Sequence, residues 1–237
     1  MGPVARRAEP PEGRSATGSA PEGVIAGAGA VREPTRRLFF AFWPTESQQQ
    51  EMAQATHERV SSAGGRAVPI QDLHVTLAFL GSVPQRRIGE LGAIAAWVAR
   101  SSVRVGPGIA MSGHGEATAS EPVAPLVSLT FGRTAYWRKP GLLCAIEASR
   151  EDRAAALAAN LRRALTAAGF SPDLKPFRAH VTLARKVSPS HTLAHAFHPV
   201  TWEFGDIALI DSRTQAGGSL YSVVDRWILC RDGAPKR

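Results

Sequence analysis

Apolar residues in the first half of the chain fall into short runs separated by longer mixed stretches. Residues 38–43 are mostly apolar and end at Pro44, which is typical of a buried strand. Thr45 followed by Gln48 has the residues of a helix capping box, and a pair of glycines closes the helical pattern that follows. The pattern predicts strands at 38–43, 68–80, 103–112 and 125–131, and helices at about 45–62 and 84–100.

The second half of the chain repeats this order of elements. It begins with an apolar run, continues through an alanine-rich helical stretch that ends at Gly169, and then returns to a strand pattern. The pattern predicts strands at 142–146 and from 180, a helix at about 150–168, a loop or short helix at 188–198, and a closing hairpin with strands at 202–212 and 219–229.

The five-residue sequence His-Val-Thr-Leu-Ala occurs twice, starting at His74 and at His180. Side chains alternate between the two faces of a strand, so His74 shares a face with Thr76, and His180 shares one with Thr182. The intervening valine and leucine point to the opposite face and are expected to belong to the core. One such motif would be weak support for a site, whereas the duplicated motif predicts two histidines that face each other.

The segments in front of the two motifs are also similar. In each half an apolar strand and a helical stretch precede the histidine, and the two intervals are nearly equal. Two copies are too few for a solenoid, so the repeat predicts two similar lobes. The resulting fold class is α+β.

The composition divides the chain into three parts. Residues 1–35 are rich in Gly, Pro, Ala, Ser, Arg and Glu and contain neither leucine nor an aromatic residue, so we expect a disordered extension. An RNA-binding arm is the alternative for this segment. Residues 36–232 are expected to form one domain whose lobes share a cleft, and residues 233–237 form a tail.

The formal net charge of +8 and the sequence pI of about 10.4 favour an anionic partner such as RNA or a nucleotide phosphate. A general preference for arginine is the alternative explanation. Cys144 and Cys230 have the spacing of neither a disulfide framework nor a zinc site. The longest apolar runs fall short of the ~20 residues that span a bilayer. We expect a monomer in a reducing cytoplasm, without a membrane partner.

Two histidines in one cleft can divide acid–base work between them. The unperturbed pKa of histidine is about 6.5, so one imidazole can be neutral and accept a proton while the other is charged and donates one. The hydroxyls of Thr76 and Thr182 can donate to the oxygens of a bound anion, and Arg185 can stabilise developing negative charge. These groups suit the cleavage of a phosphodiester without a metal or any other cofactor.

The motifs and their surroundings resemble the two-histidine phosphoesterase superfamily, and specifically its RNA 2′,3′-cyclic phosphodiesterase (2′-5′ RNA ligase-like) branch. The resemblance covers about residues 37–229. It is carried by Arg37-Leu38-Phe39-Phe40-Ala41, by His74 to Gly81, by Pro176 to Arg185, and by the closing hairpin from Ile210 to Tyr221.

The resemblance implies two antiparallel sheets around a central cleft, with outer helices. It implies that His74 protonates the leaving 3′ oxygen, that His180 activates the attacking water, and that Thr76, Thr182 and Arg185 bind the phosphate. The substrate would be an RNA end or a small cyclic nucleotide. Reversible 2′-5′ ligation of RNA and a non-catalytic nucleotide- or RNA-binding module remain as alternatives.

Two details of the motifs need a structural explanation. Arg185 is an odd number of residues from His180, so the strand must bulge or end before it if both side chains are to face the cleft. The residue that corresponds to Arg185 in the first motif is Phe79, which is expected in the core, with base stacking as the alternative. A further hypothesis concerns His191, His195 and His198, whose helical spacing would allow a metal site.

Overall fold

The computed structural model describes residues 33–101, 127–148, 152–188, 195–215 and 218–229, all within one compact unit, Glu33–Arg237. Most of the predicted N-terminal extension, the predicted strand at 103–112, Cys230 and the predicted tail lie outside these ranges. The described residues contain three α-helices, α1 (Glu46–Ser62), α2 (Ile88–Ser101) and α3 (Asp152–Ala167), and two 3₁₀ turns, η1 (Ile70–Asp72) and η2 (Gln85–Arg87).

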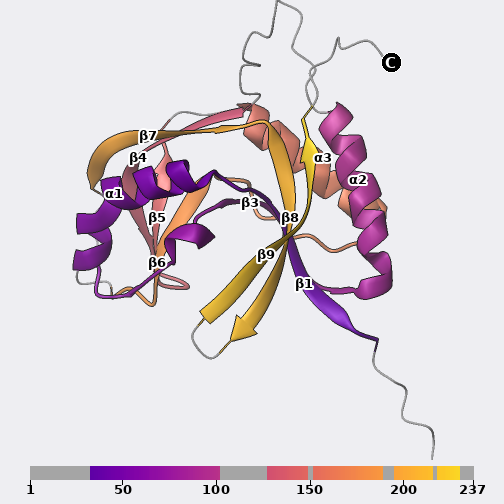
Figure 1. Ribbon diagram of the computed structural model, residues 1–237, viewed down its shortest axis with the longest axis horizontal. Helices are drawn as coiled ribbons and strands as arrows, with labels where there is room; N and C mark the ends of the chain where they lie inside the picture. Colours follow the sequence, from indigo (N-terminus) through magenta and orange to yellow (C-terminus); the bar gives the residue numbers. More distant parts are fainter. Residues whose placement is uncertain (1–32, 102–126, 149–151, 189–194, 216–217, 230–237) are drawn as a thin grey trace, which may run out of the picture. The chain divides into compact units, whose positions relative to one another are not determined.

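The strands of the described residues form two antiparallel sheets (Figure 1). The four-stranded sheet has the order β3-β1-β8-β9 and consists of β1 (Thr35–Phe42), β3 (Val75–Pro84), β8 (Asp206–Gln215) and β9 (Gly218–Ile228). The five-stranded sheet has the order β2-β6-β5-β4-β7 and consists of β2 (Arg66–Ala67), β4 (Val127–Trp137), β5 (Leu142–Glu147), β6 (His180–Arg185) and β7 (Ala196–Phe204). The predicted α+β class is confirmed.

Each sheet takes strands from both halves of the sequence. β1 and β3 of the first half pair in the same sheet as β8 and β9 from the end of the chain, whereas β4 pairs with β5 and β7 in the other sheet. The two motif strands, β3 and β6, thus lie in different sheets. The first half of the sequence does not build one sheet by itself, because long-range pairs complete both.

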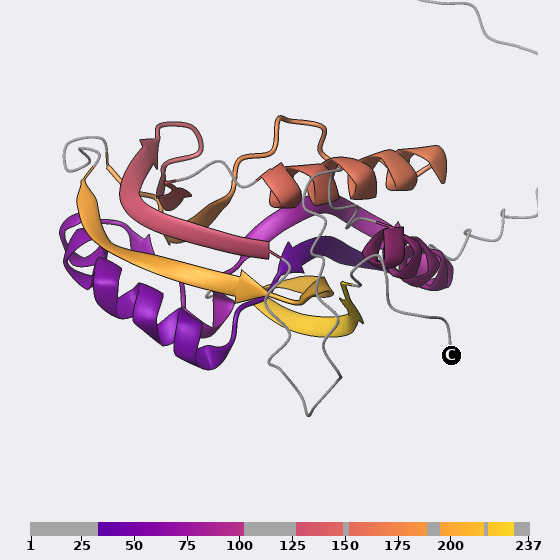
Figure 2. The ribbon, with the colours of Figure 1, turned by 90° about the horizontal axis from the view of Figure 1, so that it is seen from above.

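Three helical elements cover the sheets (Figures 1 and 2). α1 contacts β7 and β6, while α2 and α3 pack against each other. The predicted capping box is present at the start of α1, where Thr45 Oγ1 accepts from the Gln48 backbone and the Gln48 side chain accepts from the Thr45 backbone. α2 begins later than expected, because β3 continues to Pro84 and a 3₁₀ turn precedes the helix.

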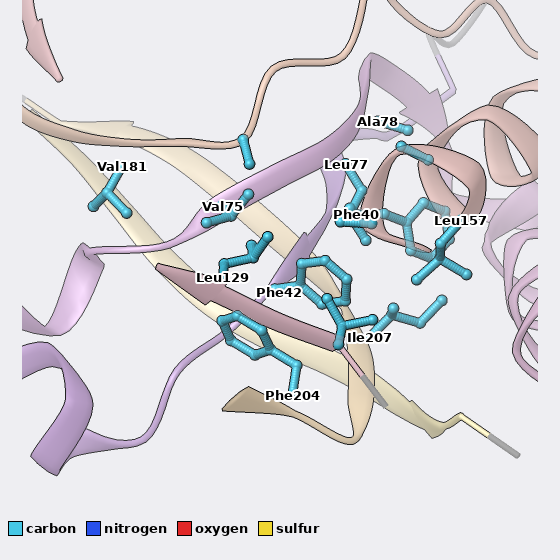
Figure 3. Packing of buried hydrophobic residues seen from close by; sticks show 14 of the residues in the cluster. Phe40, Phe42, Val75, Leu77, Ala78, Leu129, Leu157, Val181, Phe204 and Ile207 are labelled. Carbon is cyan, nitrogen blue, oxygen red and sulfur yellow. The ribbon is translucent and has the colours of Figure 1, made fainter. Parts of the chain in front are cut away.

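The core is continuous between the two sheets. Figure 3 shows Phe42, Phe204 and Ile207 packed together with Leu129, and Val75 of β3 lies in the same buried cluster as Val181 of β6. The rings of Phe42 and Phe204 are stacked at a centroid distance of 4.6 Å. Burial of these apolar surfaces is the main term that holds the motif strands in place.

The expected single strand at 202–212 is wrong. Two strands occupy this region, β7 and β8, and Gly205 separates them. They belong to different sheets, so the chain passes from one sheet to the other at this glycine. The predicted closing hairpin is present, because β8 and β9 pair antiparallel through to Gly218.

Candidate active site

The two motif histidines lie at equivalent places in the two sheets. His74 immediately precedes β3, and His180 is the first residue of β6. Thr76 and Thr182 follow two residues later, and each is partly exposed between buried neighbours. The charge of His180 contributes to the pKa of His74, so the imidazoles lie close enough to interact electrostatically.

The two imidazoles are held in the same way. His74 Nδ1 lies 2.6 Å from the carbonyl oxygen of Asp72, and His180 Nδ1 lies 2.7 Å from the carbonyl oxygen of Arg178. A carbonyl oxygen only accepts hydrogen bonds, so each Nδ1 carries a proton and donates it. The Nε2 atom of each ring is therefore the one left for proton exchange with a substrate.

The predicted bulge before Arg185 is present. Leu143 pairs with Ala184 and Cys144 pairs with Thr182, so Leu183 has no partner across the β5–β6 ladder. The extra residue changes the alternation of faces, and Arg185 becomes partly exposed on the side of His180 and Thr182. The charge of Arg185 lowers the pKa of His74, which places the guanidinium within electrostatic reach of the first motif.

The first motif has a matching bulge. In the β1–β3 ladder, Phe40 pairs with Ala78 and Ala41 pairs with Thr76, so Leu77 is skipped. The structure thus repeats the second motif down to the position of its bulge. Phe79 takes the place of Arg185 and is half-buried in a small cluster with Phe39, while Arg37 lies over its ring at 4.8 Å. The repeat is symmetric in backbone and asymmetric in charge.

The backbone carbonyl of the bulged residue accepts a hydrogen bond from outside the motif strand in both motifs. Arg162 of α3 donates from Nε to the carbonyl oxygen of Leu77 at 2.9 Å. The corresponding carbonyl in the second motif, that of Leu183, accepts from the backbone N–H of Val68 at 2.8 Å. Both bulged residues therefore have a partner for the carbonyl that the sheet ladder leaves out.

Replacing Arg162 with methionine is expected to lower the free energy of unfolding by about 1–3 kcal/mol, because the partly buried Leu77 carbonyl would lose its donor. Urea denaturation measures this change. Arg163→Met is the matched control, since Arg163 is exposed on the same helix and bonds only locally to Asn160 among the described residues. Equal stability of the two variants would contradict a supporting role for Arg162.

Aromatic rings surround both histidines. Trp43 stacks on His74 at a centroid distance of 5.3 Å and an interplanar angle of 11°, and Phe39 and Tyr221 also contact this ring. The ring centroid of Trp137 lies 4.4 Å from that of His180. Sequence analysis missed these neighbours. Alternation along residues 38–43 could have placed Trp43 on the face of Phe39, but Tyr221 comes from a strand that is distant in sequence.

Burial shifts the pKa of both histidines downward. Desolvation lowers the pKa of His74 to about 4, and the charges of Arg185 and His180 act in the same direction, while the hydrogen bond to Asp72 opposes the shift. Desolvation also lowers the pKa of His180, with a further contribution from the charge of Arg178. Both rings are therefore neutral at pH 7 before a ligand binds.

Cys144 is buried beside the second motif, as expected for a small apolar residue. Burial raises the pKa of its thiol to about 12, and the thiol is hydrogen-bonded to the Thr182 hydroxyl. A thiol with this pKa stays protonated at neutral pH and is a poor nucleophile. Cys144 lies directly across the ladder from Thr182.

Other basic and imidazole side chains of the second half lie at different places. Arg178 is close enough to His180 to affect its pKa, whereas Lys175 forms an ion pair with Asp173. His195 precedes β7 and His198 lies within it, so the helical spacing behind the metal-site hypothesis is wrong for this pair. His191 lies outside the described residues, and among those described no group of three or more His, Cys, Asp or Glu residues could hold a metal ion.

No helix within the described ranges is long and apolar enough to cross a bilayer.

Comparisons with known proteins match the parts of the chain that contain both motifs. The sequence model of the LigT like phosphoesterase family matches residues 43–105 and 146–221, which include both motifs. Two similar proteins are RNA 2′,3′-cyclic phosphodiesterases. The one from Thermus thermophilus is 25% identical over 81% of this chain and 90% of its own length, and the one from Escherichia coli is 26% identical over 84% and 99%.

Solved structures show the same fold. The crystal structure of Escherichia coli LigT complexed with 3′-AMP matches with a TM-score of 0.64 and 23% identity, covering 84% of this chain and all of that one. The crystal structure of TT0787 from Thermus thermophilus matches with a TM-score of 0.62 and 23% identity, covering 83% and 99%. The match of the family model over more than half of the sequence, together with the duplicated motif, shows that the chain belongs to the LigT like phosphoesterase family.

Proposed function

We propose that this protein hydrolyses the terminal 2′,3′-cyclic phosphate of RNA to a 2′-phosphate, with His74 as the acid and His180 as the base and without a divalent metal. The observation that carries the proposal is the matched pair of Nδ1–H contacts to backbone carbonyls. These contacts leave one proton-exchanging nitrogen on each of two imidazoles that interact with each other. A binding module would have no need for two such groups.

In the proposed reaction, His180 Nε2 accepts a proton from a water molecule that attacks the phosphorus. His74 Nε2 donates a proton to the 3′ oxygen as the P–O3′ bond breaks, so the phosphate remains on the 2′ oxygen. Thr76, Thr182 and Arg185 bind the non-bridging oxygens, on which negative charge accumulates. The names of the curated relatives support this substrate, and the complexes of Escherichia coli LigT with 3′-AMP, NADP+ and ATP support a nucleotide ligand.

The proposal is tested by incubating the purified protein with an oligoribonucleotide that ends in a 2′,3′-cyclic phosphate, in the presence of EDTA. The expected product ends in a phosphomonoester that a phosphatase removes, because acid, base and anion ligands are all side chains. Failure to open the ring would contradict the proposal. Loss of activity in EDTA that one metal ion restores would contradict its metal-independent mechanism. Joining to an added 5′-hydroxyl oligonucleotide in the same assay would favour 2′-5′ ligation.

The pH dependence of the rate is expected to be bell-shaped, with its maximum for kcat/KM below pH 6.5. The rate falls at low pH when His180 becomes protonated, and it falls at higher pH when His74 loses its proton. Both pKa values are lowered in the free protein, and that of His74 lies near 4. Because kcat/KM reports the free enzyme, its bell must lie on the acidic side.

The profile of kcat is expected to peak at a higher pH than that of kcat/KM. A bound phosphate diester is negatively charged and favours the protonated form of His74, which raises its pKa in the complex. Initial rates at saturating and at low substrate concentration between pH 4 and 9 separate the two profiles. A kcat/KM maximum above pH 8 would contradict the assigned protonation states.

A further inference from the structure

A small pocket adjoins the active site and shares Arg185 with it, but the proposed reaction uses none of its other wall residues. It has a volume of about 240 Å³ and lies between the two sheets, with walls from both. This volume is below that of pockets that enclose a drug-sized molecule, so it suits a phosphate group with part of a sugar better than a whole nucleotide. The residues of its wall that matter here are Arg66, Asp72, Arg185, Gly218, Ser219 and Tyr221.

Two arginines face this pocket from neighbouring strands. Arg66 of β2 is the direct partner of Arg185 in the β2–β6 ladder, and side chains of directly opposite residues project from the same face. Like charges at such positions repel each other. An anion bound beside both guanidinium groups would be attracted by two positive charges at once. Arg185 is the residue assigned to the reacting phosphate, so Arg66 lies one strand further along the same face.

Two glycines allow the backbone to approach closely enough to place Arg66 at the pocket. A Cβ atom at Gly65 would lie 2.6 Å from the carbonyl oxygen of Arg185, so only glycine lets β2 approach the end of β6 so closely. A Cβ atom at Gly218 would lie 3.1 Å from Nη1 of Arg66, so the guanidinium lies against the β8–β9 hairpin. Arg66 is thus positioned at an exposed edge of the pocket before any ligand arrives, which reduces the entropy cost of binding.

The wall of the pocket also contains the carboxyl group of Asp72, which is 7% exposed. Desolvation raises the pKa of Asp72, while the charge of Arg185 opposes that shift. The remaining polar groups of the wall are hydroxyls, those of Ser219 and Tyr221. Hydroxyls donate to phosphate oxygens or accept from a ribose hydroxyl. Two arginines and two hydroxyls make this edge of the site suitable for the sugar–phosphate backbone.

We propose that Arg66 binds the phosphodiester group immediately upstream of the terminal nucleotide and so selects RNA ends over free cyclic mononucleotides. This inference rests on the proposed function and names its substrate class. A mononucleotide 2′,3′-cyclic phosphate has only the phosphate that Arg185 contacts. A dinucleotide with the same terminus has a second phosphate, which Arg66 binds on the adjacent strand. Arg66 acts in substrate selection and takes no part in the proton transfers.

The test compares two substrates, a cyclic mononucleotide and a dinucleotide that ends in the same cyclic phosphate. Arg66→Gln is expected to lower kcat/KM for the dinucleotide by about tenfold, the size of one charge-assisted contact. The same variant should change kcat/KM for the mononucleotide by less than about twofold. Arg66→Lys should retain part of the preference, because the charge remains. In Arg66→Gln, the slope of log kcat/KM for the dinucleotide against the logarithm of the salt concentration should become shallower by about one.

The control is Arg226→Gln, because Arg226 forms an ion pair with Asp206 outside the pocket. It should leave the ratio of the two kcat/KM values unchanged. Equal losses on both substrates in Arg66→Gln would show that Arg66 acts on the reacting phosphate or on the fold, and would overturn the inference, as would no loss on either. If the wild-type protein opens neither substrate, the proposed function itself fails. If it opens both equally well, only the inference on substrate length fails.

Discussion

Replacing His74 or His180 with alanine is expected to reduce the rate of ring opening by at least about 10²-fold in each variant. General acid–base catalysis by a positioned side chain typically contributes 10²–10⁴-fold. Each replacement removes the Nε2 atom that the proposed mechanism uses for proton exchange. The measurement is the initial rate of opening of a cyclic mononucleotide by each purified variant.

His57→Ala is the matched control for these two variants. His57 is exposed on α1 and its replacement should leave the rate unchanged. Full activity of either His74→Ala or His180→Ala would contradict the two-histidine mechanism. Thermal unfolding of each variant should distinguish loss of catalysis from loss of fold.

His74 couples the stability of the fold to pH. Its pKa is near 4 in the folded protein and near 6.5 in the unfolded chain, so the unfolded state binds the proton more tightly. This part of the stability is fully present above pH 6.5 and is lost as the pH falls towards 4. The wild-type melting temperature should therefore decline across this window. The decline should be smaller in His74→Ala, while His57→Ala should behave like the wild type.

Replacing Arg185 with methionine is expected to reduce kcat/KM by about 10²–10³-fold, the typical loss when one group that stabilises a developing oxyanion is removed. The bulge at Leu183 turns this guanidinium towards the motif side chains. A lysine at this position should restore only part of the rate, because it lacks the planar fork that binds two phosphate oxygens at once.

The same variant has a second expected effect, on the pH profile. The charge of Arg185 lowers the pKa of His74, so its removal should raise that pKa and shift the maximum of the kcat/KM bell to higher pH. Arg226→Met, outside the site, should leave rate and profile unchanged. A loss of less than about threefold, or an unshifted maximum, would contradict the assigned place of Arg185.

The duplicated motif allowed much of the site to be predicted, because strand alternation fixes which side chains share a face. The same rule required a bulge or a strand end before Arg185, and the ladder contains a bulge at Leu183. The matching bulge at Leu77 could not be predicted, since Phe79 gave no reason to expect a change of face. Its carbonyl depends on Arg162, which is 85 residues away in the sequence.

The distribution of the strands between the two sheets could not be predicted from the sequence either. Apolar periodicity identifies strands, but partners such as β1 and β8 are set by long-range packing. A single glycine, Gly205, did not mark the end of a strand clearly enough in the sequence, so one strand was expected at 202–212 where two belong to different sheets. Tyr221 of β9 contacts His74 because β9 joins the sheet of β1 and β3 through β8. This long-range pairing is why the aromatic neighbours of the histidine were missed.

The central claim, that His180 activates water while His74 releases the 3′ oxygen, is tested most directly by the position of the phosphate in the product. An oligoribonucleotide with a terminal 2′,3′-cyclic phosphate should be converted to the 2′-phosphate alone, identified by chromatography against synthetic 2′- and 3′-phosphate standards. The nearly symmetric backbone of the two motifs would allow either oxygen to leave, so the product isomer reports the assignment of roles. A 3′-phosphate product would show that the roles or the substrate orientation are reversed, and an unopened ring would contradict the account as a whole.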